Sequence, residues 1–223
     1  MGELAASIAH EVNQPLSAIV TNSQAAMRWL VREQPDYQEV VAALNRVNRD
    51  ANLAGDVIAR IRNFLSQGEI RREPLAVRRV IDDLLLMLQA LLQESAIQVD
   101  VRIAPSLPTL LADPVQVQQV LLNLVINAVD AMRDSAQHSR ILTIDVRASV
   151  PEGLVFSVRD TGPGISAGME AKIFDALFST KCDGLGMGLA ISRSIIENHG
   201  GRLRLEPVFG VGANFVFNIP VDQ

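Results

Sequence analysis

The chain has 223 residues, which is room for one or two domains. Hydrophobic residues make up 48% of it and charged residues 20%, so it can bury a core, and the 4% of aromatic residues imply that this core is aliphatic. The net charge of −5 argues against binding to nucleic acid, which requires a basic face, and the single cysteine, Cys182, excludes a disulfide scaffold.

No apolar run approaches the roughly 20 residues that span a bilayer. The chain nevertheless begins abruptly inside a predicted helix, so we expect a fragment whose upstream sensor portion is missing. We expect this fragment to be cytoplasmic, with any membrane contact made through that upstream region.

Two long helices are predicted at the start of the chain, over residues 2–31 and 36–66, with a polar break between them. Apolar residues of the second helix recur at steps of four and three, which is the spacing of a coiled-coil seam. Two such helices cannot bury their apolar stripes alone, so we expect the hairpin to pair with a second copy as a homodimeric four-helix bundle. A polar connector then separates a first domain, residues 1–68, from a second, residues 74–223.

The second domain alternates helices and strands, which predicts a two-layer α+β sandwich. Asp113 followed by Pro114 marks the start of one helix, as an N-cap and a first-turn proline. A glycine-rich stretch over residues 161–186 lacks periodicity and is predicted to be a long mobile loop. The predicted helices are 77–94, 113–132 and 185–198, and the predicted strands are 97–103, 141–149, 154–160, 202–206 and 213–220.

His10 lies almost opposite the apolar stripe of the first helix, so we expect it to be exposed. Glu11 is its neighbour, and a carboxylate that accepts a hydrogen bond from one ring nitrogen makes the other a better nucleophile. Gln14 lies one turn further along the same face, and Pro15 is expected to kink the helix. An idle surface histidine is the alternative interpretation, and the pair of residues alone does not remove it.

Two amides lie one turn apart in a predicted apolar helix, in the run Asn123-Leu-Val-Ile-Asn127-Ala-Val-Asp130. Buried amides need partners, and an amide oxygen is a hard ligand suited to Mg²⁺, an ion that also binds substrate phosphates. Asparagines that bridge neighbouring backbone groups explain the same pattern equally well.

Asp160 directly follows a predicted strand, in the run Asp160-Thr-Gly162-Pro-Gly164-Ile165. A carboxylate at this point can accept a hydrogen bond from an exocyclic amine, as on adenine, and would repel the carbonyl of guanine. The two glycines let the backbone approach a ring closely. An ordinary turn after a strand is the alternative, because the same residue types favour turns.

A second glycine-rich motif, Gly184-Leu-Gly186-Met-Gly188, opens a predicted helix. Backbone N–H groups and the helix dipole at such a point form a cradle for phosphate. The motif is neither a Walker A loop nor a dinucleotide fingerprint, and alone it is weak evidence. Lys181, just upstream, is placed to reach a phosphate oxygen, although surface lysines are usually only solvated.

In this order and at these separations, the four blocks resemble the sensor histidine kinases of two-component signalling over essentially the whole chain. The sequence around His10 is closest to the branch that includes oxygen-sensing and nitrogen-regulatory kinases. The blocks that carry the resemblance are His10 to Leu16 (H box), Asn123 to Asp130 (N box), Asp160 to Ile165 and Gly184 to Gly188 (G boxes), Phe174 to Phe178 (F box) and Gly210 to Phe215 (last glycine block).

The resemblance implies a Bergerat-type ATP-binding fold and an enzyme that uses ATP and Mg²⁺ to phosphorylate its own His10. Glu11 would be the acid/base partner, Asn127 the Mg²⁺ ligand and Asp160 the residue that holds adenine. The phosphoryl group would then pass to an aspartate on the receiver domain of a response regulator. The implied nucleotide-binding residues are Asn123, Asn127, Asp130, Asp160, Gly162, Gly164, Ile165, Lys181, Gly184, Leu185, Gly186, Met187 and Gly188.

Three positions depart from the family pattern. Gln14 stands four residues after His10, where Thr or Asn is usual for phosphatase activity toward the response regulator, so the resemblance does not extend to that activity. Ala176 stands where the F box often carries proline, which predicts a looser lid over residues 166–183. Ala213 replaces a frequent threonine near the adenine, which predicts modestly weaker nucleotide binding.

Two other functions fit parts of the pattern. A stand-alone ATPase of the gyrase, chaperone and mismatch-repair superfamily shares the nucleotide fold, but it places a glutamate where this chain has Asn123, and asparagine cannot activate water as a base. A non-catalytic dimeric scaffold would have a degenerate pocket, whereas Asn127, Asp160 and the glycines are all present. We therefore expect transfer to His10 rather than hydrolysis.

Overall fold

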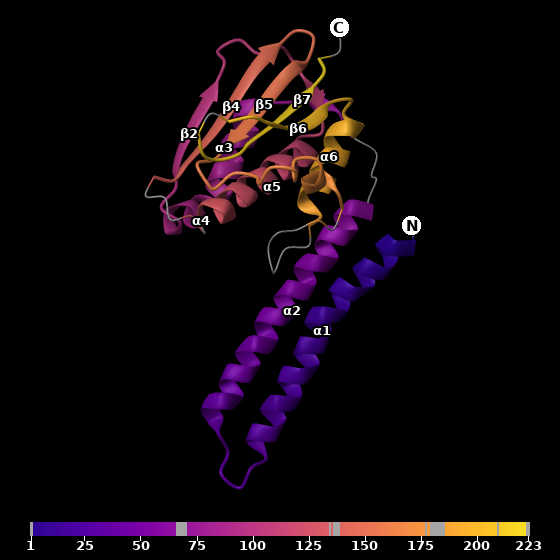
Figure 1. Ribbon diagram of the computed structural model, residues 1–223, viewed down its shortest axis with the longest axis vertical. Helices are drawn as coiled ribbons and strands as arrows, with labels where there is room; N and C mark the ends of the chain where they lie inside the picture. Colours follow the sequence, from indigo (N-terminus) through magenta and orange to yellow (C-terminus); the bar gives the residue numbers. More distant parts are fainter. Residues whose placement is uncertain are drawn as a thin grey trace. The chain divides into compact units, whose positions relative to one another are not determined.

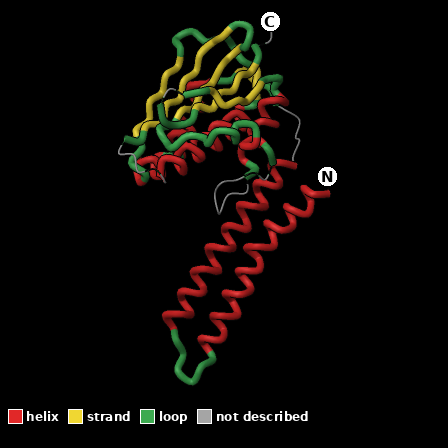
Figure 2. Tube along the Cα trace, in the orientation of Figure 1, coloured by secondary structure: helices red, strands yellow, loops and turns green. Residues whose placement is uncertain are grey.

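A computed structural model describes residues 2–65, 71–133, 135, 139–176, 178, 186–208 and 210–221. Within these ranges the side chains of 2–13, 52, 53 and 56–65 are not described. The chain divides into two compact units, Met1–Gly68 and Glu69–Gln223. Figures 1 and 2 show the helices and strands of each unit.

The first unit is a hairpin of two long antiparallel helices, α1 (Gly2–Leu30) and α2 (Tyr37–Leu65) (Figure 1). Both helices agree with the predicted ranges to within one residue at each end. Small side chains let the helices approach closely, since Ala26 on α1 and Ala43 on α2 are buried where the two helices pack.

A polar cluster also links the two helices of the hairpin. Asn22 on α1 donates from its Nδ2 to Oδ2 of the buried Asp50 on α2, at 3.2 Å. Its Oδ1 in turn accepts from Nε of Arg46 at 3.0 Å. Asp50 therefore has partners inside the unit, as a buried carboxylate requires.

The second unit has a five-stranded mixed sheet that is covered on one face by helices (Figure 2). The strand order is β2-β4-β5-β7-β6, in which β2 pairs with β4 in parallel and the other neighbours are antiparallel. The strands are β2 (Gln98–Ile103), β4 (Ile141–Ser149), β5 (Gly153–Arg159), β6 (Arg202–Glu206) and β7 (Asn214–Ile219).

The helical layer consists of α3 (Val77–Met87), α5 (Pro114–Arg133) and α6 (Gly188–Asn198) (Figure 1). Alternate residues of the central strands point into this layer, and the rings of Phe156 and Phe217 stack with centroids 4.6 Å apart. Helix and sheet together form the two-layer α+β sandwich that the sequence predicted. The unit also contains the short strand β1 (Glu73–Pro74), which pairs with β3 (Leu111–Ala112), and the short helix α4 (Gln89–Glu94).

The structure corrects three expectations about the second unit. The predicted helix over 77–94 is broken at Leu88, whose φ of −94° and ψ of 3° are not helical, and the chain continues as α4. The stretch over 161–186 contains one turn of 3₁₀ helix, η1 (Lys172–Phe174). Helix α6 begins at Gly188 instead of Leu185, a residue that lies outside the described part of the chain.

Among the helices that the structure describes, none has both the length and the apolar character that crossing a membrane requires.

Candidate functional site

Asp160 lies at the end of β5 and is almost fully buried, with 4% of its surface exposed. Its Oδ1 accepts hydrogen bonds from the backbone N–H groups of Gly162 at 2.8 Å and Ala213 at 3.2 Å. Burial raises the pKa of this carboxyl above its usual range, and the two backbone hydrogen bonds and nearby Arg159 oppose that rise. Among described residues both hydrogen bonds go to Oδ1, which leaves Oδ2 to accept from a ligand.

Glycines allow two backbone segments, residues 160–164 and 210–213, to meet around Asp160. A Cβ on Gly162 would lie 2.9 Å from Oδ1 of Asp160, and one on Gly212 would collide with the carbonyl oxygen of the same residue. Gly164 has a φ of +79°, and a Cβ there would lie 2.8 Å from the Gly212 carbonyl oxygen. Side chains at these positions are therefore excluded by the fold itself, before any ligand is considered.

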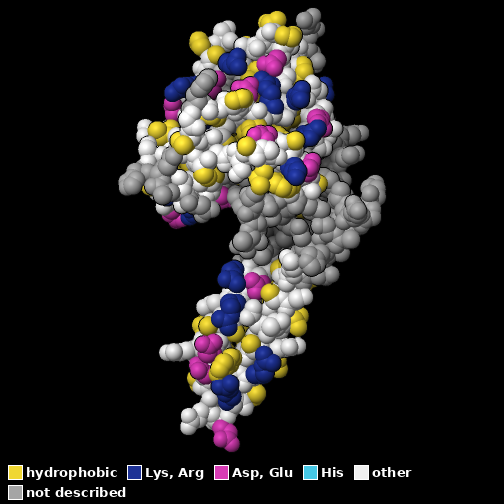
Figure 3. All heavy atoms as spheres, viewed as in Figure 1, with side chains coloured by type: hydrophobic (Ala, Val, Ile, Leu, Met, Phe, Trp, Pro, Cys, Tyr) yellow, Lys and Arg dark blue, Asp and Glu magenta, His cyan; other side chains and the backbone are white. Residues whose placement is uncertain are grey.

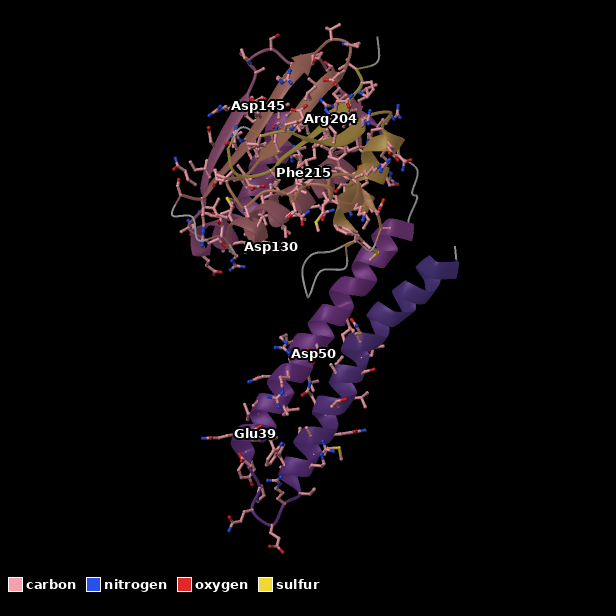
Figure 4. The ribbon with its side chains drawn as sticks, in the orientation of Figure 1. Glu39, Asp50, Asp130, Asp145, Arg204 and Phe215 are labelled. Carbon is pink, nitrogen blue, oxygen red and sulfur yellow. The ribbon has the colours of Figure 1, made fainter. Side chains whose placement is uncertain are left out.

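The predicted asparagine pair lies on α5, facing the start of α6. Asn123 donates from its Nδ2 to the carbonyl oxygen of Gly188 at 3.4 Å and to Oγ of Ser192 at 3.3 Å. Asn127, one turn later, is half-buried and makes no hydrogen bond with a described residue, so its amide is available to a ligand. Asp130, also half-buried, follows on the same helix and is labelled in Figure 4.

The start of α6 offers backbone donors without a side-chain cap. Met187 occupies the N-cap position, is 2% exposed and makes no capping hydrogen bond. The first N–H groups of α6 therefore lack an internal partner and can bind an anion such as phosphate. Gly186, just before them, has a φ of +61°, which favours glycine. The predicted contributors Lys181, Gly184 and Leu185 lie outside the described residues.

The segment between the two glycine motifs is anchored by one of its aromatic residues, Phe174. The ring of Phe174 in η1 meets the ring of Phe215 on β7 edge-on, with centroids 6.2 Å apart. Phe215 is labelled in Figure 4. Ile173 beside it is buried, whereas Ala176 is exposed. Ile165 at the other end of the segment is half-buried. Lid residues 177 and 179–183 lie outside the described part.

The predicted phosphoacceptor belongs to the other unit. His10 and Glu11 lie within α1, as predicted, and their side chains are outside the described set, so the expected exposure of His10 stays a prediction. Gln14 is exposed, and Pro15 lies inside α1, which continues through it.

Two participants escaped the sequence analysis. Ser192, fully buried, accepts from Asn123 and would have been detectable only as a small polar residue on the inner face of α6. His199 occupies the C-cap of α6, and its ring accepts a hydrogen bond from the N–H of Asp113, 86 residues away in the sequence.

The described side chains at this site do not form a ready-made set of metal ligands, so a bound metal ion would also need ligands from its substrate or from water. Within the described ranges there is no group of three or more His, Cys, Asp or Glu side chains suited to holding one. An ion that depends on one or two protein oxygens and on substrate phosphates is the kind of site Mg²⁺ favours.

Comparison with known proteins agrees with both units. Residues 1–90 match the family described as "His Kinase A (phospho-acceptor) domain", and residues 112–223 match "Histidine kinase-, DNA gyrase B-, and HSP90-like ATPase". The second unit therefore contains an ATP-binding domain of that family.

Individual relatives extend the match over the whole chain. The chain is 39% identical to the sensor histidine kinase TmoS of Ectopseudomonas mendocina, covering 100% of this chain and 23% of that protein. It is 37% identical to the sensor protein FixL of Bradyrhizobium diazoefficiens, covering 99% and 43%. The chain thus spans less than half the length of these two relatives.

A solved structure shows the same fold. Full-length ShkA in complex with AMPPNP aligns with a TM-score of 0.68 and 26% identity, over 99% of this chain and 46% of that one. The family matches, these relatives and the arrangement of Asp160, the asparagines and the glycines agree: the chain belongs to the sensor histidine kinases of two-component signalling.

Proposed function

We propose that this chain is the catalytic core of a sensor histidine kinase, which transfers the γ-phosphate of ATP to its own His10. Residues 1–68 act as the dimerisation and phosphotransfer domain, and residues 74–223 act as the catalytic ATP-binding domain. The observation that carries the proposal is the buried carboxylate of Asp160, with Oδ1 held by two backbone N–H groups and Oδ2 left for a donor on the ligand.

Adenine fits this acceptor because its exocyclic amine donates a hydrogen bond, whereas guanine presents a carbonyl at the equivalent position. A buried carboxylate that met the guanine carbonyl would have neither a partner nor water. The uncapped start of α6 suits the phosphates of the same ligand. The related ShkA was solved with AMPPNP, a nucleotide of this class.

Mg²⁺ is the metal expected with ATP, and Asn127 is the residue proposed to hold it. Its half-buried amide has no partner among the described residues, and an amide oxygen is a suitable hard ligand. Mg²⁺ neutralises the charge that develops on the phosphates during transfer.

Transfer to histidine is favoured over hydrolysis because no base is placed to activate water at the Asn123 position. Asparagine has no useful basicity, and this side chain is already engaged by Gly188 and Ser192. In the proposed step, a ring nitrogen of neutral His10 attacks the γ-phosphorus, a P–N bond forms and the bond to the ADP oxygen breaks. Glu11 accepts the proton from the ring.

The partner of the hairpin is proposed to be a second copy of the chain. Apolar residues lie exposed along one face of each helix, among them Met27 on α1, 66% exposed, and Leu44 on α2, 48% exposed. Figure 3 shows apolar side chains between the charged ones on the hairpin surface. Such a face is typical of a bundle that lacks its other half.

The second partner is proposed to be a response regulator, whose receiver aspartate takes the phosphoryl group from His10. This step regenerates the neutral histidine and breaks the P–N bond. Gln14 departs from the residues usual for the reverse, phosphatase reaction, so the proposal covers the forward transfer alone.

Incubation with γ-labelled ATP and Mg²⁺ tests the proposed function. Label on the parent protein should be labile in acid and stable in base, as a phosphohistidine is. His10→Ala should lose the label and keep ATP binding, whereas Asp160→Ala should lose both. Full labelling of His10→Ala would contradict the assignment, and free phosphate without labelled protein would favour an ATPase.

A further inference from the structure

The ring of His199 uses both of its nitrogens inside the second unit. The residue is 5% exposed and caps the C-terminus of α6. Its Nε2 lies 3.1 Å from the backbone N of Asp113, and its Nδ1 lies 2.8 Å from the carbonyl oxygen of Ile195. Because the Asp113 N–H is a donor, Nε2 must accept. The ring is therefore neutral, and its proton sits on Nδ1, donated to Ile195.

Among the described residues, this contact and a second one form polar ties between α5 and α6. The first joins the beginning of α5 to the end of α6, through Asp113 and His199. The second joins the middle of α5 to the beginning of α6, where Asn123 donates to Gly188 and Ser192. Two ties at separate points along an antiparallel pair oppose both sliding and rotation of one helix past the other, which a single tie or apolar packing alone does not.

The segment that begins the second unit, with Arg71 and Arg72, also contacts the region where Asp113 meets the end of α6. Asp113 caps α5 by accepting on Oδ1 from the N–H groups of Val115 and Gln116, while its Oδ2 accepts from the N–H of Arg71 at 3.2 Å. The side chain of Arg72 donates to the carbonyl oxygen of Asn198 at 3.4 Å. Among these described contacts, the hydrogen bond from the backbone N–H of Asp113 is the one that the His199 ring accepts.

We infer that His199 is a positioning residue for nucleotide binding, whose neutral ring fixes the register of α6 against α5. The inference rests on the proposed function, in which Gly188 and Asn127 face the same triphosphate. Helix α6 has 11 residues, or about 16 Å at 1.5 Å per residue, so His199 at its far end does not touch the phosphates. Its effect reaches them through the helix, since a rotation at one end moves the N–H groups at the other.

Two amide substitutions separate the two hydrogen bonds of the ring. The side-chain amide of His199→Asn reaches the position of Nδ1 and can still donate to Ile195, but it is too short to accept from Asp113. His199→Gln places its amide near the position of Nε2, where its oxygen can accept from the Asp113 N–H, and it loses the local bond to Ile195. Comparing the two variants therefore separates the hydrogen bond from Asp113, which links α5 to α6, from the hydrogen bond to Ile195, which lies within α6.

Two readouts are taken on the full 223-residue chain at a temperature well below unfolding. The dissociation constant for ATP with Mg²⁺ is measured by calorimetric titration, and amide hydrogen exchange is followed in residues 188–191 without nucleotide. For His199→Asn we expect a dissociation constant about five- to tenfold higher and faster exchange at the start of α6. His199→Gln should stay within about twofold of the parent in both readouts.

Equal losses in the two variants, or parent-like values in His199→Asn, would overturn the inference, because ring packing or the local cap would then be the only role of His199. A general loss of stability is recognised separately, since it lowers the midpoint of thermal unfolding without changing the affinity of the folded protein. If the parent bound no ATP, the proposed function would fail. The exchange measurement would still decide whether His199 holds the register of α6.

Discussion

The Oδ1 atom of Asp160 lies 3.2 Å from the backbone N of Ala213, and the backbone N of Asp160 lies 3.0 Å from the Ala213 carbonyl oxygen. A single residue therefore fastens the end of β5 to the start of β7 and also presents the acceptor proposed for adenine. Its side chain has a structural role on Oδ1 and a proposed recognition role on Oδ2, and a substitution can separate the two.

Asp160→Asn keeps the size of the side chain and one oxygen that can accept from Gly162 and Ala213. Because burial raises the pKa of Asp160 in the folded protein, its contribution to stability is present below the unfolded-state pKa and is lost as the pH rises through the raised value. At a pH above both the unfolded-state pKa and the raised folded-state pKa, the charged carboxylate of Asp160 lowers the free energy of unfolding. At pH 7 the free energy of unfolding of Asp160→Asn should therefore equal or exceed that of the parent.

The same variant should bind ATP about 10- to 100-fold more weakly, because an amide nitrogen replaces the acceptor that the adenine amine needs. Urea unfolding at pH 7 and pH 4 and calorimetric titration with ATP measure the two effects. The stability difference between variant and parent should shrink toward the acid side. Parent-like ATP affinity would show that Oδ2 does not hold the base.

Gly212 and Gly210 form a matched pair for the close approach of backbone around Asp160. Both have positive φ, +105° and +101°, so alanine is strained at either position. Only at Gly212 would a Cβ also collide with the Asp160 carbonyl oxygen, since no atom of the described residues lies within 4 Å of a Cβ at Gly210. We expect Gly212→Ala to lose about 3 kcal/mol or more of unfolding free energy and Gly210→Ala about 1–2 kcal/mol.

Equal losses in chemical denaturation would mean that φ strain alone explains both glycines and that the segments around Asp160 have room to separate. If Gly212→Ala lost more unfolding free energy than Gly210→Ala and also bound ATP more weakly, the close contact between Gly212 and Asp160 would matter for ATP binding as well as for folding.

Gly188 differs from these glycines because the fold does not require it. A Cβ there would come no closer than 3.9 Å to Asn123, which is ordinary contact. Gly188→Ala should therefore fold at least as well as the parent, with a gain of up to about 1 kcal/mol from helix propensity. Its ATP affinity should nevertheless fall about tenfold, because a methyl group at the first turn of α6 obstructs the approach of phosphate.

Gly55→Ala in α2 is the control for Gly188→Ala. Gly55 is also helical, no described atom lies within 4 Å of a Cβ placed there, and it belongs to the other unit. The variant Gly55→Ala should raise the midpoint of thermal unfolding without altering ATP affinity. If Gly188→Ala behaved in the same way, the start of α6 would not be the phosphate site.

Local sequence signals were sufficient for much of this architecture. Asp113 and Pro114 predicted the beginning of α5, and the structure confirms the cap through the hydrogen bonds from Val115 and Gln116 to Oδ1. The hairpin helices were predicted to within a residue because a long apolar repeat defines both their type and their length.

Features that depend on distant contacts were not predictable in this way. Leu88 interrupts a helix with neither glycine nor proline to mark it, because tertiary packing outweighs local propensity there. The two-residue strands β1 and β3 are too short to show a pattern. The contact of His199 was not predictable because its donor, Asp113, is 86 residues away in the sequence.

Leu44 provides the last prediction, which concerns the second copy proposed to pair with the hairpin. Leu44 is 48% exposed on α2, and neighbouring Asn45 is exposed as well. A glutamate at either position therefore leaves the interior of the hairpin undisturbed. In a symmetric dimer each Leu44 side chain is buried once per copy, worth about 2 kcal/mol each. Leu44→Glu should therefore weaken dimerisation about 1000-fold or more, with two buried charges adding to the loss.

Asn45→Glu is the control, since it adds the same charge one residue away on a polar face. Sedimentation velocity over a range of concentrations should show monomers for Leu44→Glu and dimers for Asn45→Glu. ATP affinity should be unchanged in both variants, because the residues proposed to bind nucleotide lie in the other unit. A dimer that survives Leu44→Glu would mean that the exposed stripe on α2 is not the surface that joins two copies.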